Sequence, residues 1–335
     1  MDLFTNWTTV TLAANWDARN SHAACDYDQK LFLMGGHDGT SYLNDVWSSL
    51  DGGNTWGEVT PAADWVGRMY HKLIEFDDKM FVMGGFDGNN ALNDVWSSSD
   101  GSTWTLETST ADWSGRFQAG CIVYDNKIYI MGGSPGGSTR YNDVWSSIDG
   151  STWVQITSNA NWNGRNSMGV IVYGGEMYVV GGISVTGAKN DVWSSTDGIN
   201  WVEVATTLPW TARWSHGAVL YDNKMFIMGG YDGSSRLSDT WSSNDGGITW
   251  VEQTPIVQWN DRLGLSSVVY DNKLLVLGGG GTTLKYNDVW SLDLISTTTI
   301  PNDTPPDMFK KAIGLSWTCG HMAFFAYIGA IYIRN

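Results

Sequence analysis

Six arginines recur at one fixed place in this sequence and offer its most concentrated charge chemistry. Each stands 16 residues before a Gly-Gly pair: Arg19, Arg68, Arg116, Arg165, Arg213 and Arg262. A guanidinium group presents a rigid fork of donors that matches a carboxylate, a sulfate or a phosphate. Six of them around one opening would form an anion site. Alternatively, each arginine joins neighbouring repeats by bonding backbone carbonyls or the recurrent aspartates, which are also six: Asp45, Asp94, Asp143, Asp191, Asp239 and Asp288.

Three histidines follow three of these arginines at a spacing of three residues. They are His22, His71 and His216, and the other repeats have Ala119, Met168 and Leu265 at that place. Imidazole can move protons near neutral pH, so the three histidines are weak acid/base candidates. We favour a structural role for them. No cysteine or carboxylate stands at ligand spacing nearby, so we expect no metal site and no cofactor.

The loops that follow the Gly-Gly pairs differ from repeat to repeat and combine cations with aromatic rings. The candidate ligand-binding residues there are Arg140, Lys189, Arg236 and Lys285 with Tyr42, Phe86, Tyr141, Tyr231 and Tyr286. Exposed aromatic rings beside cations are typical of binding surfaces, although ordinary solvated loops have the same composition. The sequence has no phosphate-binding glycine loop, no His-Glu-x-x-His and no nucleophile elbow, and we assign no catalytic residue.

Tryptophans reveal the elements that must position these side chains. They form three columns with steps of 48 or 49 residues, and Trp7 completes the second column from the N-terminus. In the third unit, runs at 120–124, 127–131, 142–147 and 152–156 read as strands, joined by Asp-Asn and Asp-Gly turns. Four antiparallel strands per unit of about 49 residues is the size of a propeller blade.

The sequence therefore predicts an all-β fold, a six-bladed propeller over residues 1–294. The last unit supplies three strands and the segment around Trp7 the fourth, which leaves no open edge. In this topology the arginine segments and the loops after Gly-Gly share one face. We expect both sets to lie near the mouth of the central channel.

The repeat resembles that of kelch propellers, the fold of the galactose oxidase central domain, in its Gly-Gly pair, the arginine before it and the later tryptophan. The resemblance covers all six units and implies the fold more than a function. Galactose oxidase also has a tyrosine–cysteine copper site, whereas here we read Cys25 and Cys121 as core thiols. The stretch from Ser49 to Trp56 resembles the Asp-box of sialidases, which implies a structural turn.

Composition and charge narrow the classes of partner that the protein could bind. The net charge is −16, from 19 Lys+Arg against 35 Asp+Glu, so we expect no nucleic-acid binding. The three cysteines lack zinc or disulfide spacing, and the N-terminus has no signal-peptide pattern. These features favour the cytoplasm, or attachment on the cytoplasmic side of a membrane, and we expect a monomeric propeller.

The last residues leave the repeat. Residues 295–309 read as a linker, and residues 310–335 form a hydrophobic tail. Residues 312–333 carry no formal charge, which suits one transmembrane helix. A helix packed on the propeller, or the truncated end of a longer protein, fits the pattern as well.

Three functions remain open. The first is a non-catalytic binding module that presents an arginine-bearing, aromatic loop face to a protein or an anionic glycan. The second is a carbohydrate-active enzyme such as a sugar-acid mutarotase or epimerase, because some kelch propellers act on sialic acid. It would need a general base such as His22, His71 or His216. The third is a membrane-tethered structural or adhesive protein, which depends on the tail.

Overall fold

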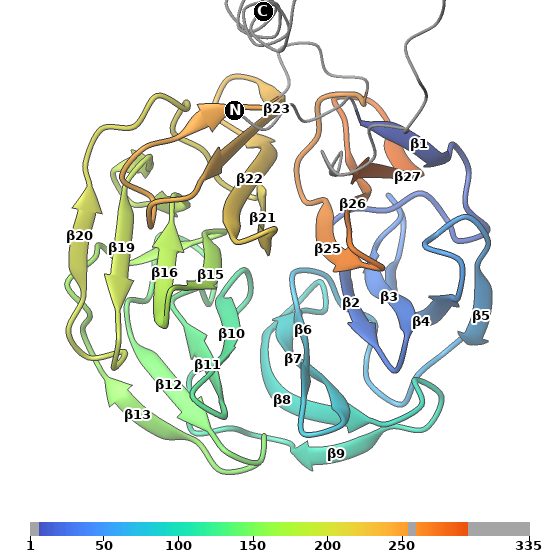
Figure 1. The fold of residues 1–335 in the computed structure, drawn as a ribbon. Coiled ribbons are helices and arrows are strands. Elements are labelled where there is room, and N and C mark those ends of the chain that lie inside the picture. The colour runs from blue at the N-terminus through green and yellow to red at the C-terminus, as the bar shows by residue number, and fades with distance from the viewer. Residues whose placement is uncertain (1–6, 254–258, 294–335) are drawn as a thin grey trace, which may run out of the picture. The chain divides into compact units, whose positions relative to one another are not determined.

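Six four-stranded antiparallel sheets form a ring in the computed structural model, which describes residues 7–253 and 259–293 (Figure 1). The chain divides into two compact units, residues 1–294 and 295–335. The expected linker at 295–309 and the expected tail at 310–335 lie outside the described residues. Within the described part of the chain, no helix is long and apolar enough to cross a membrane.

In each sheet the first strand lies nearest the centre of the ring, and the second, third and fourth strands follow it outward (Figure 1). The first strands are β2 (Ala23–Tyr27), β6 (Lys72–Phe76), β10 (Gly120–Tyr124), β15 (Gly169–Tyr173), β21 (Gly217–Tyr221) and β25 (Ser266–Tyr270). The second are β3 (Lys30–His37), β7 (Lys79–Phe86), β11 (Lys127–Met131), β16 (Glu176–Val180), β22 (Lys224–Tyr231) and β26 (Lys273–Gly280).

The third strand of each sheet carries one of the three columns of recurrent tryptophans. The third strands are β4 (Tyr42–Ser49), β8 (Ala91–Ser98), β12 (Val144–Ser147), β19 (Val192–Ser195), β23 (Arg236–Ser243) and β27 (Lys285–Asp293). The fourth are β5 (Gly57–Thr60), β9 (Thr105–Thr108), β13 (Val154–Thr157), β20 (Val202–Ala205), β24 (Val251–Glu252) and β1 (Thr8–Thr11). A small extra sheet contains β14 (Arg165–Asn166), β17 (Ile183–Ser184) and β18 (Gly187–Ala188).

The N-terminal strand closes the ring as expected. Strand β1 pairs antiparallel with β27, so strands from the two ends of the described chain share one sheet. Each first strand also contacts the first strands of both neighbouring sheets, from β2 around to β25. No sheet edge is left open between the first and the last unit, which removes a place where the ring could part.

Tryptophan pairs fill the spaces between neighbouring sheets. A third-column ring meets a second-column ring edge-on in each space, at centroid distances of 5.8–6.1 Å: Trp16–Trp56, Trp65–Trp104, Trp113–Trp153, Trp162–Trp201, Trp210–Trp250 and Trp7–Trp259. The displaced Trp7 thus makes the same contact as its five counterparts. Edge-to-face pairs of this size contribute about 0.5–1.5 kcal/mol beyond the burial of their area.

The turns show why the predicted strand limits are right at some ends and wrong at others. Asp125 and Asn126 have φ of 46° and 55°, so the tight turn between β10 and β11 begins and ends where the sequence predicts. The third and fourth strands start later than predicted, at Val144 and Val154. The indole N–H of Trp153 donates to the carbonyl of Gly150, which keeps that tryptophan in the turn.

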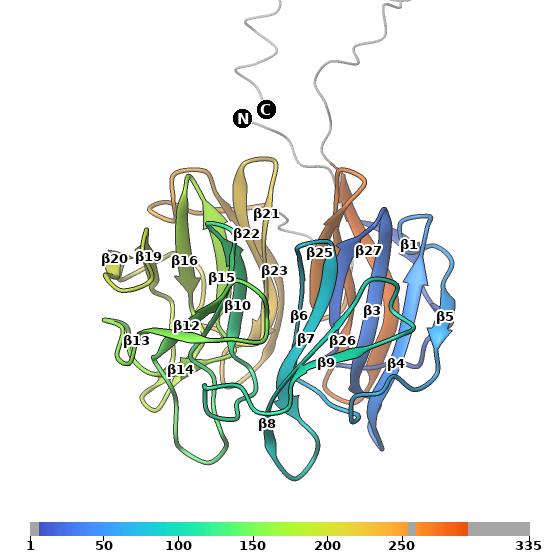
Figure 2. The same ribbon diagram turned by 90° about the horizontal axis from the view of Figure 1, so that it is seen from below.

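The two faces of the ring carry different connections, as Figure 2 shows from the side. One face, which we call the loop face, carries the loops after the Gly-Gly pairs and the segments that contain the repeated arginines. The residue after an arginine pairs there with the residue after a Gly-Gly pair, as in Met69 with Phe86 and Trp214 with Tyr231. The opposite face, the turn face, carries the short turns between first and second strands and between third and fourth strands.

Candidate functional site

The six repeated arginines lie inside the protein and each has an aspartate partner. Both terminal nitrogens of every guanidinium donate to one carboxylate, at 2.6–2.9 Å: Arg19 to Asp45, Arg68 to Asp94, Arg116 to Asp143, Arg165 to Asp191, Arg213 to Asp239 and Arg262 to Asp288. The arginine residues are 0–1% exposed. One nitrogen also donates to the carbonyl of the first glycine of the Gly-Gly pair, as Arg19 does to Gly35 at 3.0 Å.

Each arginine spans two sheets. The backbone N–H of Arg68 donates to the carbonyl of Leu43 in β4, while its side chain bonds Asp94 in β8 of the next sheet. The ring of Trp65 lies 5.7 Å from the guanidinium carbon. Burial alone would raise the pKa of Asp191, but the bonds from Arg165 and Trp193 outweigh burial and lower it. The Asp191 carboxyl is therefore ionised at neutral pH, and its ion pair with Arg165 forms part of the contact between two sheets.

This placement corrects the expectation that the repeated arginines line the mouth of the channel. A ligand in solvent cannot reach guanidinium groups that are fully enclosed and already bonded to carboxylates. The sequence also allowed a role in joining the repeats, and that is the role their contacts show. The arginines are Arg19, Arg68, Arg116, Arg165, Arg213 and Arg262.

A closed ring of backbone hydrogen bonds surrounds the central channel. The residue two places after each repeated arginine donates its N–H to the carbonyl of its counterpart in the preceding unit, at 2.7–3.1 Å. All six have φ between 52° and 61°: Ser21, Tyr70, Gln118, Ser167, Ser215 and Gly264. Five of the six are not glycine, so the ring holds side chains in a conformation that L residues rarely adopt. These six residues line a cavity of about 90 Å³ in the channel.

The three histidines face the same cavity but are buried. Burial and the neighbouring arginine lower the pKa of His22 and of His216 to about 3, and the same two causes lower the pKa of His71. The nitrogens of His216 have no hydrogen-bond partner among the described residues, whereas the backbones of Leu277 and Arg68 interact with His22 and His71 and partly oppose the lowering of their pKa. All three histidines are neutral at pH 7, and bases this weak accept a proton poorly. Ala119, Met168 and Leu265 occupy the equivalent places.

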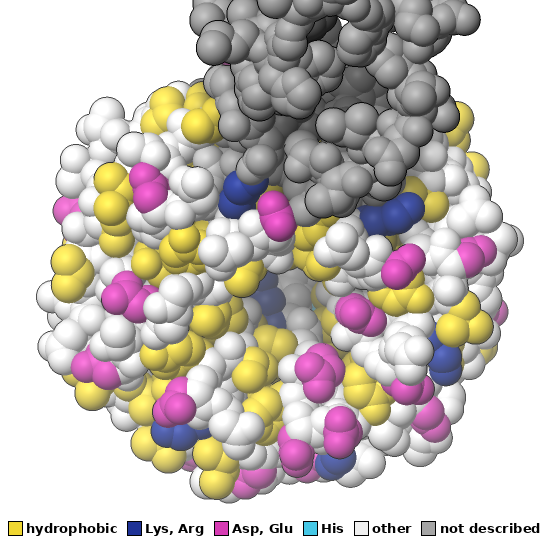
Figure 3. All heavy atoms as spheres, viewed as in Figure 1, with side chains coloured by type: hydrophobic (Ala, Val, Ile, Leu, Met, Phe, Trp, Pro, Cys, Tyr) yellow, Lys and Arg dark blue, Asp and Glu magenta, His cyan; other side chains and the backbone are white. Residues whose placement is uncertain are grey.

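Lys72 is a channel residue that sequence reasoning missed. It begins β6 and lines the cavity with the histidines. The other units have Ala23, Gly120, Gly169, Gly217 and Ser266 at this place, so the signal was a single departure from a column of small residues. Burial lowers the pKa of Lys72. Figure 3, which views the turn face, shows a basic side chain inside the central opening and acidic side chains scattered around it.

Aromatic side chains on the loop face connect three neighbouring units. His37 contacts Tyr42 at a centroid distance of 4.8 Å, and Tyr42 contacts Phe86 at 5.9 Å. Phe86 lies 5.3 Å from Phe117, which stacks on Tyr70 at 6.1 Å. All five are partly exposed. We call this set the aromatic arc. The sequence-based prediction included Tyr42 and Phe86 but missed Phe117 and Tyr70, which follow an arginine rather than a Gly-Gly pair.

The other predicted aromatic residues have different surroundings. Tyr141 and Tyr286 pack over the buried Arg116 and Arg262, with the guanidinium carbon 4.7 Å and 4.3 Å from the ring centroid. Tyr231 contacts Trp214 at 4.9 Å and also lies beside Arg236. Trp214 is one of the two tryptophans outside the three columns, and this was the signal that could have placed it in the site.

The four loop cations, Arg140, Lys189, Arg236 and Lys285, are partly exposed. Arg140 donates to three oxygens of its own loop, and Lys189 donates to the hydroxyl of Thr186. Arg236 donates to the carbonyl of Gly280, and the Lys285 nitrogen lies 3.2 Å from Nδ1 of His37. Among residues 7–253 and 259–293, none of the four forms an ion pair with a carboxylate within 4.0 Å.

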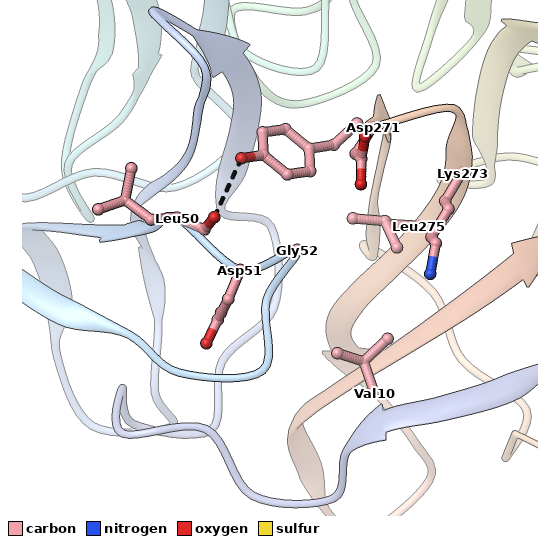
Figure 4. A pocket seen from close by; sticks show the side chains of 8 residues that line it. Val10, Leu50, Asp51, Gly52, Asp271, Lys273 and Leu275 are labelled. Carbon is pink, nitrogen blue, oxygen red and sulfur yellow. Dashed lines mark hydrogen bonds between the residues drawn. The ribbon is translucent and has the colours of Figure 1, made fainter.

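A larger cavity of about 230 Å³ lies between the first and last sheets, next to residues 50–52 and 271 (Figure 4). Its polar groups are largely used within the protein. The hydroxyl of Tyr270 bonds the carbonyls of Gln29 and Leu50, and the carboxylate of Asp51 holds the turn through Thr55 and Ser49. The Asp51 bonds hold the turn between β4 and β5. None of the predicted site residues lies in this cavity.

Two of the three cysteines, Cys25 and Cys121, lie in the described part of the chain. It contains no group of three or more His, Cys, Asp or Glu side chains that could hold a metal ion. Cys25 and Cys121 are free thiols. Burial raises the pKa of both, to about 12 for Cys121. A thiol with a raised pKa is a poor nucleophile at neutral pH.

Comparisons with known proteins agree with this architecture. The model of the KLHDC2/KLHL20/DRC7 Kelch-repeats domain matches residues 194–300, and the model of the DUF6242 beta propeller domain matches residues 18–147. The solved structure of YjhT superposes with a TM-score of 0.72 at 15% sequence identity, over 86% of this chain and 98% of that one. At this identity the likeness shows the fold alone. No curated protein sequence matches the chain.

Proposed function

The chain is a kelch-type β-propeller, and we propose that it is a binding module whose loop face holds an acidic segment of a partner protein. Its fold supports an interaction role. The acidic partner follows from the charges of the loop face. The proposal differs from the sequence-based one in its cations, because the repeated arginines are enclosed.

The observation that carries the proposal is the set of loop cations that form no ion pair with a carboxylate within 4.0 Å among the described residues, although Asp38 lies near enough to Lys285 to act on its pKa. Lys189, Arg236 and Lys285 are partly exposed in a chain of net charge −16, where acidic groups are abundant. Acidic residues on the same loops are engaged in holding those loops: the carboxylate of Asp38 accepts three hydrogen bonds from Thr40 and Ser41, and Asp232 bonds Ser234 and Ser235. Carboxylates of a partner could therefore bond the cations without displacing one of the protein's own.

The aromatic arc supports a peptide partner in particular. Its rings contact one another at 4.8–6.1 Å, so they form a continuous apolar strip rather than isolated side chains. Partly exposed aromatic residues are enriched among the residues that dominate protein interfaces. A peptide with carboxylates at one end and apolar side chains at the other would match the two sets together.

An array of acidic peptides, probed with the full chain, tests the proposal. Half of the peptides should carry Leu or Tyr beside the acidic run, and heparin and hyaluronan serve as glycan probes. The variant Lys189→Met/Arg236→Met/Lys285→Met keeps the apolar stems and removes three charges. We expect it to weaken the best peptide by roughly tenfold to a hundredfold, because each charge pair contributes up to about 1 kcal/mol.

A matched control removes the same charge from the other face. Lys30, Lys79 and Lys127 begin second strands beside the turn face. Their triple change to Met should leave peptide affinity unchanged. Equal loss in both triple variants would mean that only net charge matters, and unchanged affinity in the loop-face variant would overturn the proposal. Glycan binding without peptide binding would replace the peptide by an anionic glycan.

The other two hypotheses stay predictions with weaker support. An enzyme acting on a sugar acid needs a base, and the pKa of His22 and of His216 is lowered to about 3. Anomer exchange of sialic acid, measured with and without the protein, tests it directly. Membrane attachment depends on residues 310–335, so fractionation with and without residues 307–335 decides it.

A further inference from the structure

The central channel contains a small polar cavity to which every unit contributes. The cavity of about 90 Å³ is lined by the six ring residues, by His22, His71 and His216, and by Lys72 and Met168. Lys72 is the only lysine or arginine among these residues, and no carboxylate lines the cavity. The cavity shares Tyr70 with the aromatic arc, but none of the loop cations on which the proposed function depends lines it.

Lys72 departs from the repeat in a way that the fold does not require. Its counterparts are alanine, glycine and serine, so the sheet forms without a long side chain at this place. No ion pair or hydrogen bond of its amine is found in the described part of the chain. Lys72 is partly exposed, but the removal of water around its amine still lowers its pKa, and a partly desolvated cation without a counter-charge is costly.

Several neighbours of Lys72 also lack partners. The hydroxyls of Ser21 and Ser167 and both nitrogens of His216 are buried and make no hydrogen bond with the described residues. All three residues line this one cavity, together with His22 and His71. Buried polar atoms are nearly always bonded to protein, water or ligand. Their concentration around a single ammonium group points to an occupant that accepts hydrogen bonds.

We propose that the channel binds one small carboxylate anion, with the Lys72 ammonium as its counter-charge and the hydroxyls of Ser21 and Ser167 as donors. An anion complements the one cation of the lining, whereas a metal cation would find no carboxylate there. A neutral imidazole can donate one N–H, so the histidines can add donors without adding charge. The volume is that of a few water molecules, which suits formate or acetate.

The test uses the full chain with its lysines ¹³C-methylated and read by NMR. Acetate or formate replaces chloride at constant ionic strength. We expect a saturable shift of one lysine resonance, absent from Lys72→Met, together with a rise in the pKa of that lysine as the anion settles beside it. The resonance of the exposed Lys79, identified from Lys79→Met, should not move.

Thermal unfolding supplies a second readout that separates binding from folding. Acetate should raise the unfolding midpoint of the wild type and of Lys79→Met by the same amount, and that rise should vanish in Lys72→Met. Ser21→Ala/Ser167→Ala should weaken acetate binding by about tenfold, as expected for lost hydrogen bonds to a charged group. Equal shifts with chloride and acetate would overturn a carboxylate site. No saturable shift of the Lys72 resonance with any of the three anions would overturn the site itself.

Discussion

Two sets of cations in this protein differ in both repetition and partners. The repeated arginines occur once in every unit, are enclosed, and bond an aspartate that also occurs in every unit. The loop cations Arg140, Lys189, Arg236 and Lys285 occur in four of the six units, are partly exposed, and form no ion pair with a carboxylate within 4.0 Å among the described residues. Both sets belong to segments that the sequence assigns to the loop face. Only the loop cations are exposed to solvent there.

A side chain that recurs in every unit has an environment that the fold itself repeats. The six contacts between neighbouring sheets are alike, and the same bidentate Arg–Asp ion pair forms in each of them. A binding site on a ring of repeats need not recur in this way, because one partner touches unlike units. Lys72 follows the same logic inside the channel, where it replaces a small residue in one unit of six.

Breaking one repeated pair should have the largest effect. Arg165→Leu leaves the carboxylate of Asp191 buried, with the neutral indole N–H of Trp193 as the side-chain donor that remains to it among the described residues. We expect a loss of about 3–5 kcal/mol in the free energy of unfolding, measured by urea denaturation. The double variant Arg165→Leu/Asp191→Leu should recover part of that loss, because it removes the unpaired charge. A single variant as stable as the wild type would contradict the role assigned to the pair.

The buried histidines stand between the two sets of cations, because they occur in three units while apolar residues occupy the same place in the other three. The folded-state pKa of His216 is about 3, below its ordinary value of 6.5, owing to burial and to Arg213. Below pH 6.5 the unfolded chain binds the proton and the folded chain does not, so stability falls as the pH drops toward 3.

His216→Leu, which copies Leu265 of the next unit, removes this dependence. Between pH 7 and pH 5 the wild type should lose about 2 kcal/mol more than the variant, at roughly 1.4 kcal/mol per pH unit below 6.5. Urea denaturation at both pH values measures the difference. Parallel losses in the two proteins would show that His216 takes up a proton in the folded state.

The smallest effect on stability is expected for the loop cations. Lys189→Met, Arg236→Met and Lys285→Met should each change the free energy of unfolding by less than about 0.5 kcal/mol, as is usual for surface substitutions. The same changes should weaken the acidic peptide. A loss of stability comparable with that of Arg165→Leu would erase the distinction between the two sets.

Much of the fold follows from the sequence because the repeat is read six times. The spacing of Trp7 relative to its column predicts the closing strand, which pairs with β27 as expected. The limits of β10 and β11 are predicted to the residue because Asp-Asn turns fix them. The fourth strands are less well predicted, since a tryptophan that looks like a strand residue is held in the turn.

The site was less predictable because spacing gives the position of a residue and not the direction of its side chain. Arg165 and Arg236 are equally basic in the sequence, and only the packing shows that one is enclosed and the other partly exposed. Phe117 joins the aromatic arc through contact with Phe86 from another unit, which no local pattern encodes. The departure of Lys72 from its column was readable, but its meaning needed the cavity.

Arginine reactivity is the most direct test of the distinction between repeated and unrepeated cations. The native protein is treated with phenylglyoxal and each arginine is followed by peptide mass spectrometry, with and without the best acidic peptide. Arg236 should be modified readily and be protected by the peptide, while the six repeated arginines stay unmodified until urea unfolds the ring. If Arg165 and its five counterparts react as fast as Arg236 in the native protein, the account of enclosed, sheet-joining arginines is wrong.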